Sequence, residues 1–153
     1  NGEKMKKLIF ILIPLFIYIN CGKQVEKDIP KNNFTKEYYK DGQIKGEGNN
    51  NDDLKEGEWK YYHKTGEIRT IVNYENGKRD GNMVIYDENG NIMIEGQFID
   101  GKEDGKFIYF HNNKHIKKEG YFIKGNKHGK WITFSKDGRN FREENYIDGE
   151  LVK

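Results

Sequence analysis

The sequence predicts an all-β fold, an elongated antiparallel β-meander of tandem 24-residue hairpin repeats that follows a signal helix and a flexible tether. Three observations lead to this prediction. Similar blocks recur every 24 residues, and each begins at a glycine: Gly57, Gly81, Gly105 and Gly129. Within a block the apolar residues alternate at a spacing of two, as they do on a β-strand. Paired turn residues close every block, and a period of this length is typical of an extended array.

Each block is predicted to be strand, turn, strand. In the first block Trp59 and Tyr61 lie on one side of a strand and Tyr62 lies on the other. The alternation resumes at Ile68, after a turn at Gly66. Successive hairpins should pair edge to edge, which gives two strands from each of the four blocks, 57–80, 81–104, 105–128 and 129–152.

Two kinds of turn recur in the blocks. In the middle of the second and fourth blocks, Asn89-Gly90 and Asp137-Gly138 tolerate the positive φ that tight hairpins need. The third block has Asn113-Lys114 there, which predicts a looser hairpin or one that is a residue longer. The second kind of turn closes each block, at Asn76-Gly77, Asp100-Gly101, Lys124-Gly125 and Asp148-Gly149.

Large apolar side chains recur in register and predict three columns across the sheet. The first column is Trp59, Met83, Phe107 and Trp131. The second lies on the opposite face by strand parity and comprises Tyr62, Tyr86, Phe110 and Phe134. The third is Tyr74, Phe98, Phe122 and Tyr146. We expect Trp59, Trp131, the third column and the block-heading glycines to hold the repeats together. Gly96 and Gly120, in mid-strand, suit close packing beneath a neighbouring ring.

The second column is the candidate interaction surface, because aromatic side chains on rigid elements make good interface anchors. The alternative is that Tyr62, Tyr86, Phe110 and Phe134 only cover the sheet and stack on one another.

Residues 33–56 are in phase with the repeat but degraded. Tyr38 matches Tyr62 and Gly42 stands at a turn position, whereas Asn50 replaces the aromatic residue of later blocks. A degenerate first repeat suits a cap, since its outer edge meets water. The alternative is a decayed repeat that is mostly loop.

Residues 1–20 have the pattern of upstream residues plus a signal peptide. Two lysines precede an apolar run, Leu8 to Ile19, that is shorter than the roughly 20 residues of a membrane-spanning helix. The only cysteine, Cys21, follows directly. This end resembles a bacterial lipoprotein signal, which implies a lipid on Cys21, although Tyr18 and Asn20 depart from the usual residues. The alternative is an ordinary signal peptide with an incidental cysteine. Residues 21–32 are polar and are predicted to be a tether with a reach on the order of 20 Å, or else a fraying terminus.

Composition argues against several classes of function. From Cys21 onward the chain carries 24 basic and 24 acidic residues, so nothing attracts it to nucleic acid. Ser135 is the only serine and is paired with no base motif, and Glu95, Glu119 and Glu143 recur at one solvent-facing position. We therefore expect no enzyme and no small-molecule substrate.

We also expect no metal and no cofactor. The histidines lack zinc-ligand spacing. The segment Asp87–Asn91 lacks the spacing and the terminal glutamate of a calcium-binding loop, so it is interpreted as a turn.

The blocks resemble MORN repeats in the bacterial variant whose units read roughly G-x-W-x-x-Y-x-x-x-G. The resemblance extends over Gly57 to Leu151 with a weak unit before it, and the residues that carry it most completely are Gly57, Trp59, Tyr62, Gly66, Tyr74 and Gly77. Departures are Lys114 at a turn glycine, Asn140 at the position of Ile68 and Thr133 at that of Tyr61. The resemblance implies an elongated sheet that associates with proteins and sometimes with lipids, and that is not catalytic.

Three functions follow as hypotheses. The first is a protein-interaction scaffold, lipid-anchored at the bacterial cell envelope and facing the periplasm or the exterior, with an unidentified protein partner. The second comes from the resemblance alone, because proteins of this variant are often labelled as antitoxins of a YwqK type. It would be an immunity-type protein that neutralises a toxin by direct binding. The third is phospholipid binding by the folded domain, for which the sequence offers aromatic residues but no basic face.

Overall fold

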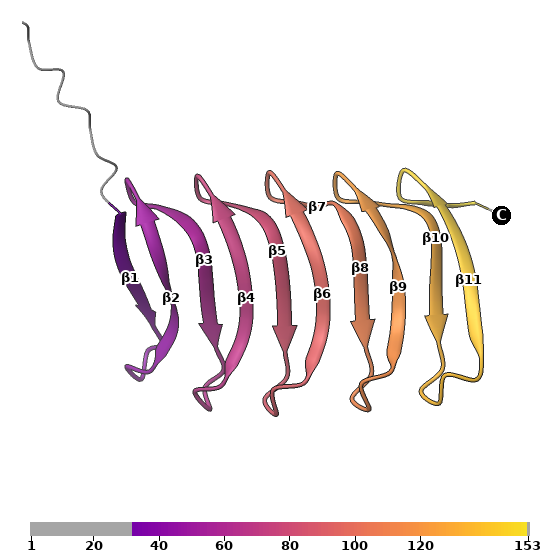
Figure 1. The fold of residues 1–153 in the computed structure, drawn as a ribbon, viewed down its shortest axis with the longest axis horizontal. Helices are drawn as coiled ribbons and strands as arrows, with labels where there is room; N and C mark the ends of the chain where they lie inside the picture. The colour runs from indigo at the N-terminus through magenta and orange to yellow at the C-terminus, as the bar shows by residue number, and fades with distance from the viewer. Residues whose placement is uncertain (1–31, 153) are drawn as a thin grey trace, which may run out of the picture.

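The computed structural model describes residues 32–152, which form one open antiparallel sheet of 12 strands with no helix in that range (Figure 1). Strands adjacent in the chain are hydrogen-bonded neighbours, except that the short β7 pairs only with β6, which also pairs with β8. The predicted all-β meander of hairpin repeats is therefore confirmed. The predicted signal helix, Cys21 and nearly all of the predicted tether lie outside the described residues, and no membrane-spanning helix is found within 32–152.

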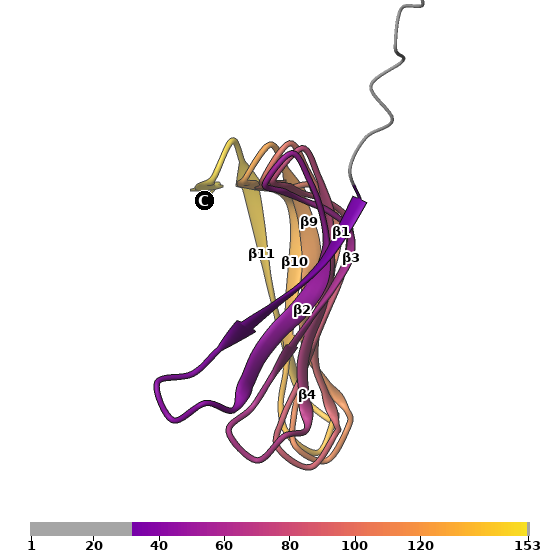
Figure 2. The same ribbon diagram turned by 90° about the vertical axis from the view of Figure 1, so that its left-hand side faces the viewer.

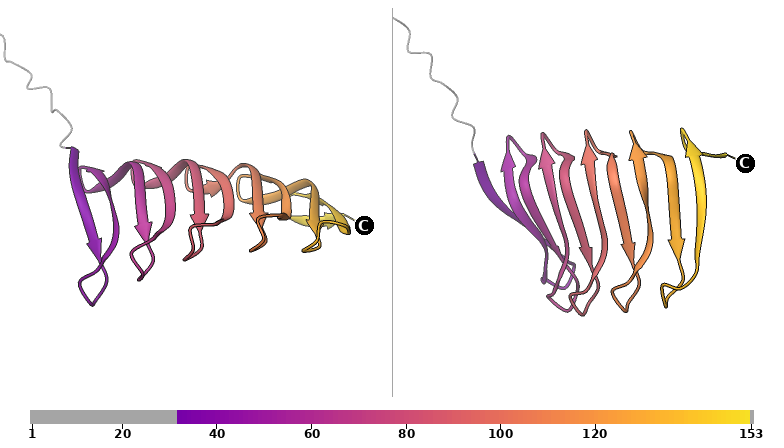
Figure 3. Two further views of the ribbon diagram at one scale, coloured as in Figure 1. Left: turned by 60° about the horizontal axis from the view of Figure 1, so that its bottom comes forward. Right: turned by 45° about the vertical axis from the view of Figure 1, so that its right-hand side comes forward.

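The strands alternate in direction along the sheet. They are β1 (Asn32–Tyr38), β2 (Ile44–Asn51), β3 (Leu54–Tyr62), β4 (Ile68–Glu75), β5 (Lys78–Tyr86), β6 (Ile92–Ile99), β7 (Lys102–Glu103), β8 (Gly105–Phe110), β9 (Ile116–Ile123), β10 (Asn126–Phe134), β11 (Phe141–Ile147) and β12 (Glu150–Val152). The segment 33–56 supplies β1, β2 and the start of β3, so it is a pair of strands and not a loop. Figures 2 and 3 show that the strands are bowed and that the sheet twists from β1 towards β11, as strand sterics require.

The block-heading glycines are kinks and do not begin every strand. Strand β3 begins at Leu54, but Gly57 inside it has a φ of 66°. The pairing with β2 shifts register here, between Gly48 and Asn49. Gly81, Gly105 and Gly129 also have positive φ, of 98°, 87° and 66°. A glycine tolerates this backbone conformation and lets the strand bend at a bulge.

The turns that close the blocks have positive φ at both central residues, as in Asn76 (49°) and Gly77 (78°). This is the two-residue turn whose twist matches that of the strands. The mid-block turns are different. Positive φ occurs at Gly90 and Gly138 but not at Asn89 or Asp137, so in each pair only the glycine uses the conformation that both residues tolerate. These loops are longer than the two-residue turns that close the blocks, and only the glycine near the end of each loop needs a left-handed backbone.

The third mid-block hairpin is neither looser nor longer, contrary to the prediction. His111 N–H donates to the carbonyl of His115 at 2.8 Å, as His63 does to Glu67 in the first block, because Lys114 adopts the glycine conformation with a φ of 67°. The extra residue is instead in the fourth hairpin, where Ser135 N–H donates to Asn140. Asn140 replaces an apolar residue that begins the strand in the other blocks, and β11 starts only at Phe141.

Hydrogen bonds also join the turns of successive repeats at the upper edge in Figure 1. Each turn glycine donates its N–H to a carbonyl in the preceding repeat, as Gly77 does to Lys55 at 2.9 Å and Gly101 does to Arg79 at 2.8 Å. In three repeats a carboxylate accepts the N–H of the residue before that glycine: Glu56 from Asn76, Asp80 from Asp100 and Asp104 from Lys124. Each repeat therefore positions the next one at this edge.

Candidate interaction surfaces

The hydrophobic core lies on one side of the sheet, which we call the tryptophan face. Its buried side chains are Trp59, Val72, Met83, Phe98, Phe107 and Trp131. The third predicted column belongs to this same face. Phe122 packs edge-on against both Phe107 and Trp131, with ring centroids 4.9 and 5.0 Å apart, and Tyr74 packs against Trp59 at 6.3 Å. The aromatic rings, together with Val72 and Met83 between them, thus form one layer on this face of the sheet.

Small residues make room for the large rings of the tryptophan face. A Cβ on Gly48 would lie 2.5 Å from the Trp59 ring, and one on Gly96 or Gly120 would collide in the same way with Phe107 or Trp131. Beside the shorter Met83, the paired position is Val72. The predicted packing of rings over Gly96 and Gly120 is therefore confirmed.

The two buried indoles also have polar partners. Trp59 Nε1–H donates to the carbonyl of Asn49 at 2.8 Å, and Trp131 Nε1–H donates to that of Tyr121 at 3.1 Å. Both acceptors lie at the register shift beside a block-heading glycine. A buried indole needs such an acceptor, so each tryptophan ties a kink to the core.

Cations cover the outer side of the aromatic layer. Lys55 Nζ lies 4.1 Å from the ring centroid of Trp59, and Lys127 Nζ lies 4.9 Å from that of Trp131. Arg79 Cζ lies 5.2 Å from that of Phe98. The long side chains shield the rings while their charged ends favour the ring faces. Sequence reasoning missed these cations, although Lys55, Arg79 and Lys127 occupy one repeat position.

Lys55 and Tyr61 form a small polar cluster on the tryptophan face. Lys55 Nζ lies 2.7 Å from a Glu37 carboxylate oxygen and donates to the Tyr61 hydroxyl. Burial acts to lower the pKa of Lys55, but the hydrogen bonds to Glu37 and Tyr61 outweigh it and raise that pKa. Burial raises the pKa of Tyr61 to about 12. This lysine therefore stays charged and the tyrosine stays neutral at physiological pH.

The opposite side of the sheet, which we call the column face, carries the predicted interaction surface. Tyr62, Tyr86, Phe110 and Phe134 are all half-buried there, at equivalent positions in four successive repeats. Tyr62 donates its hydroxyl to a Glu47 carboxylate oxygen at 2.6 Å. That hydrogen bond raises the pKa of Tyr62 to about 12 and lowers the pKa of Glu47. No other element of residues 32–152 covers this column.

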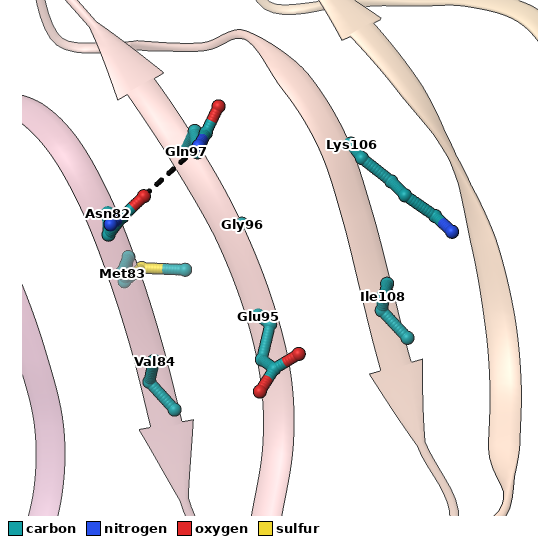
Figure 4. Close-up of a pocket in the computed structure, with 8 residues that line it drawn as sticks. All are labelled: Asn82, Met83, Val84, Glu95, Gly96, Gln97, Lys106 and Ile108. Atoms are coloured by element: carbon teal, nitrogen blue, oxygen red, sulfur yellow. Dashed lines mark hydrogen bonds between the residues drawn. The ribbon is translucent and has the colours of Figure 1, made fainter.

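Ion pairs lie beside the column. Lys106 pairs with Glu119 and Lys130 pairs with Glu143, each at 2.9 Å. The second repeat has Asn82 at the corresponding lysine position, and Asn82 binds Gln97 instead. Figure 4 shows Lys106 extending away from Glu95, so Glu95 has no cation partner among the described residues. A shallow hollow of about 330 Å³ lies here.

His63, His111 and Asp87 have structural partners. His63 Nε2 lies 3.0 Å from the carbonyl of Tyr86, and His111 Nε2 lies 3.1 Å from that of Phe134, which joins successive hairpins. The Asp87 carboxylate accepts the N–H groups of Asn89 and Asn91 within its own turn. Among residues 32–152, no three His, Cys, Asp or Glu side chains are grouped as metal ligands.

Comparison with known proteins bears on the repeats. The family model described as "MORN repeat variant" matches residues 35–49, 55–76, 79–100 and 103–124. It includes the degenerate first unit but not the fourth block, which departs at Thr133 and Asn140 and has the longer hairpin loop.

The other comparisons carry no argument about function. No curated protein sequence matches. One similar solved structure is titled "Crystal structure of GtfA/B complex bound to UDP and GlcNAc", at 10% identity and a TM-score of 0.28 over 95% of this chain. This chain spans only 28% of that one.

The family match extends over more than half of the sequence, in phase with the hairpins of the sheet. Repeats of this kind are commonly involved in protein and membrane interactions. The chain belongs to the MORN repeat variant family.

Proposed function

We propose that this protein is a non-enzymatic scaffold, held at a membrane by a lipid on Cys21, that binds a protein partner through its open sheet. The observation that supports this most directly is the aromatic column on the column face. Its four side chains lie in successive repeats, and no described element covers them.

The column has the physical properties of a binding platform. Equivalent strands of neighbouring repeats are two strand spacings apart, so the rings recur at intervals of roughly 10 Å. They are half-buried on a hydrogen-bonded sheet, which limits the conformational freedom that a partner would have to restrict. Aromatic residues held in this way are typical interface anchors.

The location rests on the sequence alone. An apolar run from Leu8 to Ile19 ends just before Cys21, as in bacterial lipoprotein signals. Acylation there would leave the folded repeats at the cell envelope, facing the periplasm or the exterior. Because Cys21 lies outside the described residues, the lipid anchor has to be tested by labelling the protein chemically. Metabolic labelling with an acyl probe should modify the protein but not its Cys21→Ser variant, and absence of label on the parent would refute the anchor.

The binding surface is tested by photo-crosslinking of the full chain in its native cell. A photoreactive group introduced at Asn82, which is exposed and lies on β5 on the same face as Tyr86, should give one defined adduct. Tyr86→Ala with Phe110→Ala should abolish that adduct. The matched control is Ile99→Ala with Ile123→Ala, which removes exposed apolar groups away from the column. An adduct that survives the first pair, in a protein that keeps its melting temperature, would refute this surface.

The same adduct tests the antitoxin alternative. If the partner is toxic when expressed alone and harmless when co-expressed with this protein, the scaffold is an immunity-type protein. A partner that is harmless on its own rejects that alternative and leaves the scaffold proposal in place.

A further inference from the structure

A hollow of about 680 Å³ lies on the tryptophan face over β2 to β5, on the opposite side of the sheet from the aromatic column. Its apolar part includes Val72, Met83 and Ile85, and the Tyr61 and Tyr74 hydroxyls lie 3.1 Å apart at its edge. Four cations line it: Lys45, Lys55, Arg69 and Arg79. We call this site the basic hollow.

The charges of the basic hollow are not balanced. Glu37 is the only carboxylate among its lining residues, and it is already paired with Lys55. Lys45, Arg69 and Arg79 make no ion pair and no side-chain hydrogen bond with any residue in the described part of the chain. The surplus is local, because residues 32–152 as a whole carry 20 lysines and arginines against 22 aspartates and glutamates.

The repeat itself provides an internal comparison. Lys45 and Arg69 occupy one repeat position, and the next repeat has Met93 there. Lys55 and Arg79 occupy another, where the next repeat has Glu103. Residues 81–104 lack both cations and still form the hairpin of β5 and β6, although the next strand is divided into β7 and β8, so the hairpin does not require them. Cations return at both positions in residues 105–128, as Lys117 and Lys127. At the basic hollow, however, four cations line one recess with a single carboxylate, and this excess of positive charge indicates a site for an anion.

We propose that the basic hollow binds an acidic segment of a protein partner. Carboxylates of that segment would accept hydrogen bonds from Arg69 and Arg79, since guanidinium groups match carboxylates in a two-pronged geometry. An apolar residue of the segment would pack between Tyr61 and Ile85. This inference rests on the proposed scaffold function and adds a second contact on the other face of the sheet.

The geometry favours a peptide over an anionic membrane. The cations surround a recess, and a few side chains can enter a recess whereas a flat bilayer surface cannot. The neighbouring turn edge carries Glu56 and Asp80, whose carboxylates an anionic membrane would repel. A short acidic segment can reach the recess between these groups.

The test uses the full chain purified in a neutral detergent and a fluorescent peptide of alternating glutamate and leucine. Fluorescence anisotropy should show saturable binding that weakens as salt is raised, because screening shortens the range of the attraction. The peptide with glutamine in place of glutamate should not bind. Arg69→Gln with Arg79→Gln should weaken binding by about tenfold for each arginine removed.

A matched variant controls for net charge. Lys136→Gln with Arg139→Gln removes the same charge from an exposed loop of the fourth hairpin and should leave binding within about twofold. If both double variants lose the same amount of peptide affinity, the binding depends only on the net charge of the protein, and the proposed site is refuted. Saturable binding of a fluorescent short-chain phosphatidylglycerol by a parent protein that does not bind the acidic peptide would assign the hollow to lipid phosphate and overturn the peptide proposal. Binding of neither ligand would also overturn it. Circular dichroism of the arginine variant establishes that it is folded.

This experiment is separate from the test of the aromatic column. If crosslinking through Asn82 succeeds and no acidic peptide binds, the basic hollow fails and the scaffold stands. If the peptide binds and the column variants keep their adduct, the hollow stands and the column surface fails.

Discussion

Gly120 lies beneath the indole ring of Trp131, and a methyl group added to Gly120 would collide with that ring. The same relationship joins Gly48 to Trp59 and Gly96 to Phe107. The second repeat instead pairs Val72 with Met83. A large ring on one strand therefore faces a glycine on the adjacent strand, whereas the shorter Met83 faces the larger Val72. In each pair the two side chains together fill a similar space.

This pairing of a large with a small side chain predicts that a second substitution can restore stability lost through a first one. Gly96→Val should destabilise the sheet by about 1–3 kcal/mol or more through overpacking against Phe107, and Phe107→Met by about 1 kcal/mol through lost packing. The double variant recreates the Val72–Met83 pair and should be more stable than Gly96→Val alone. Urea unfolding of all four proteins gives the interaction energy. Costs that simply add would show that the two positions do not share space.

Lys114 is expected to weaken the third hairpin. It holds a φ of 67° where the first two blocks have Gly66 and Gly90. A side chain in this conformation costs about 1 kcal/mol relative to glycine, so Lys114→Gly should raise the free energy of unfolding by about that amount. Gly90→Lys is the reverse exchange and should lower it. Thermal or chemical unfolding checks both, and a destabilised Lys114→Gly variant would contradict the argument.

His128 interrupts the series of turn carboxylates. Glu56, Asp80 and Asp104 each accept a backbone N–H from the turn of the next repeat, whereas His128 Nδ1 is buried and has no hydrogen-bond partner among the described residues. His128→Asp should restore the contact with Asp148 N–H and stabilise the last hairpin by about 0.5–1 kcal/mol. Asp104→Asn is the control and should cost a similar amount. Amide exchange at Asp148 should slow in the first variant only.

The hydrogen bond between Tyr62 and Glu47 makes the stability of the fold depend on pH both in the acidic and in the alkaline range. The folded pKa of Glu47 is lowered, so its contribution is complete above the unfolded value of about 4.3 and is lost as pH falls through the lowered folded value. The folded pKa of Tyr62 is raised to about 12. Its contribution is therefore complete below the unfolded value of about 10 and is lost as pH rises from there to about 12.

Tyr62→Phe should remove the effect at high pH and weaken the one at low pH, where Lys36 still lowers the pKa of Glu47. We expect the melting temperature of the parent to exceed that of Tyr62→Phe near neutral pH, with a difference that shrinks below about pH 4 and above about pH 10. Tyr86→Phe is the control, because the Tyr86 hydroxyl makes no hydrogen bond with the described residues. A difference that is constant with pH would show that Tyr62 acts only through packing.

Sequence reasoning placed the strands well but the backbone details less well. A spacing of two fixes which side chains share a face, so Trp59 and Tyr62 were correctly separated. It could not place Tyr74 on the face of Trp59, because the register shift between Tyr61 and Tyr62 and the intervening turn change the count of residues between them. Nor could it locate the longer loop in the fourth hairpin, since Lys114 accepts a strained backbone that its residue type disfavours.

The 24-residue period by itself determined that this protein is a meander of hairpins, because alternation and turn chemistry act within a few neighbouring residues. Only the tertiary structure decided that Arg69 and Arg79 line the same hollow as Lys45 and Lys55. Those residues are far apart in the chain, and they come together through strand register, the kinks at the glycines and the twist of the sheet. The physical reason is that burial and charge act through distances in space, which a repeat in one dimension does not specify.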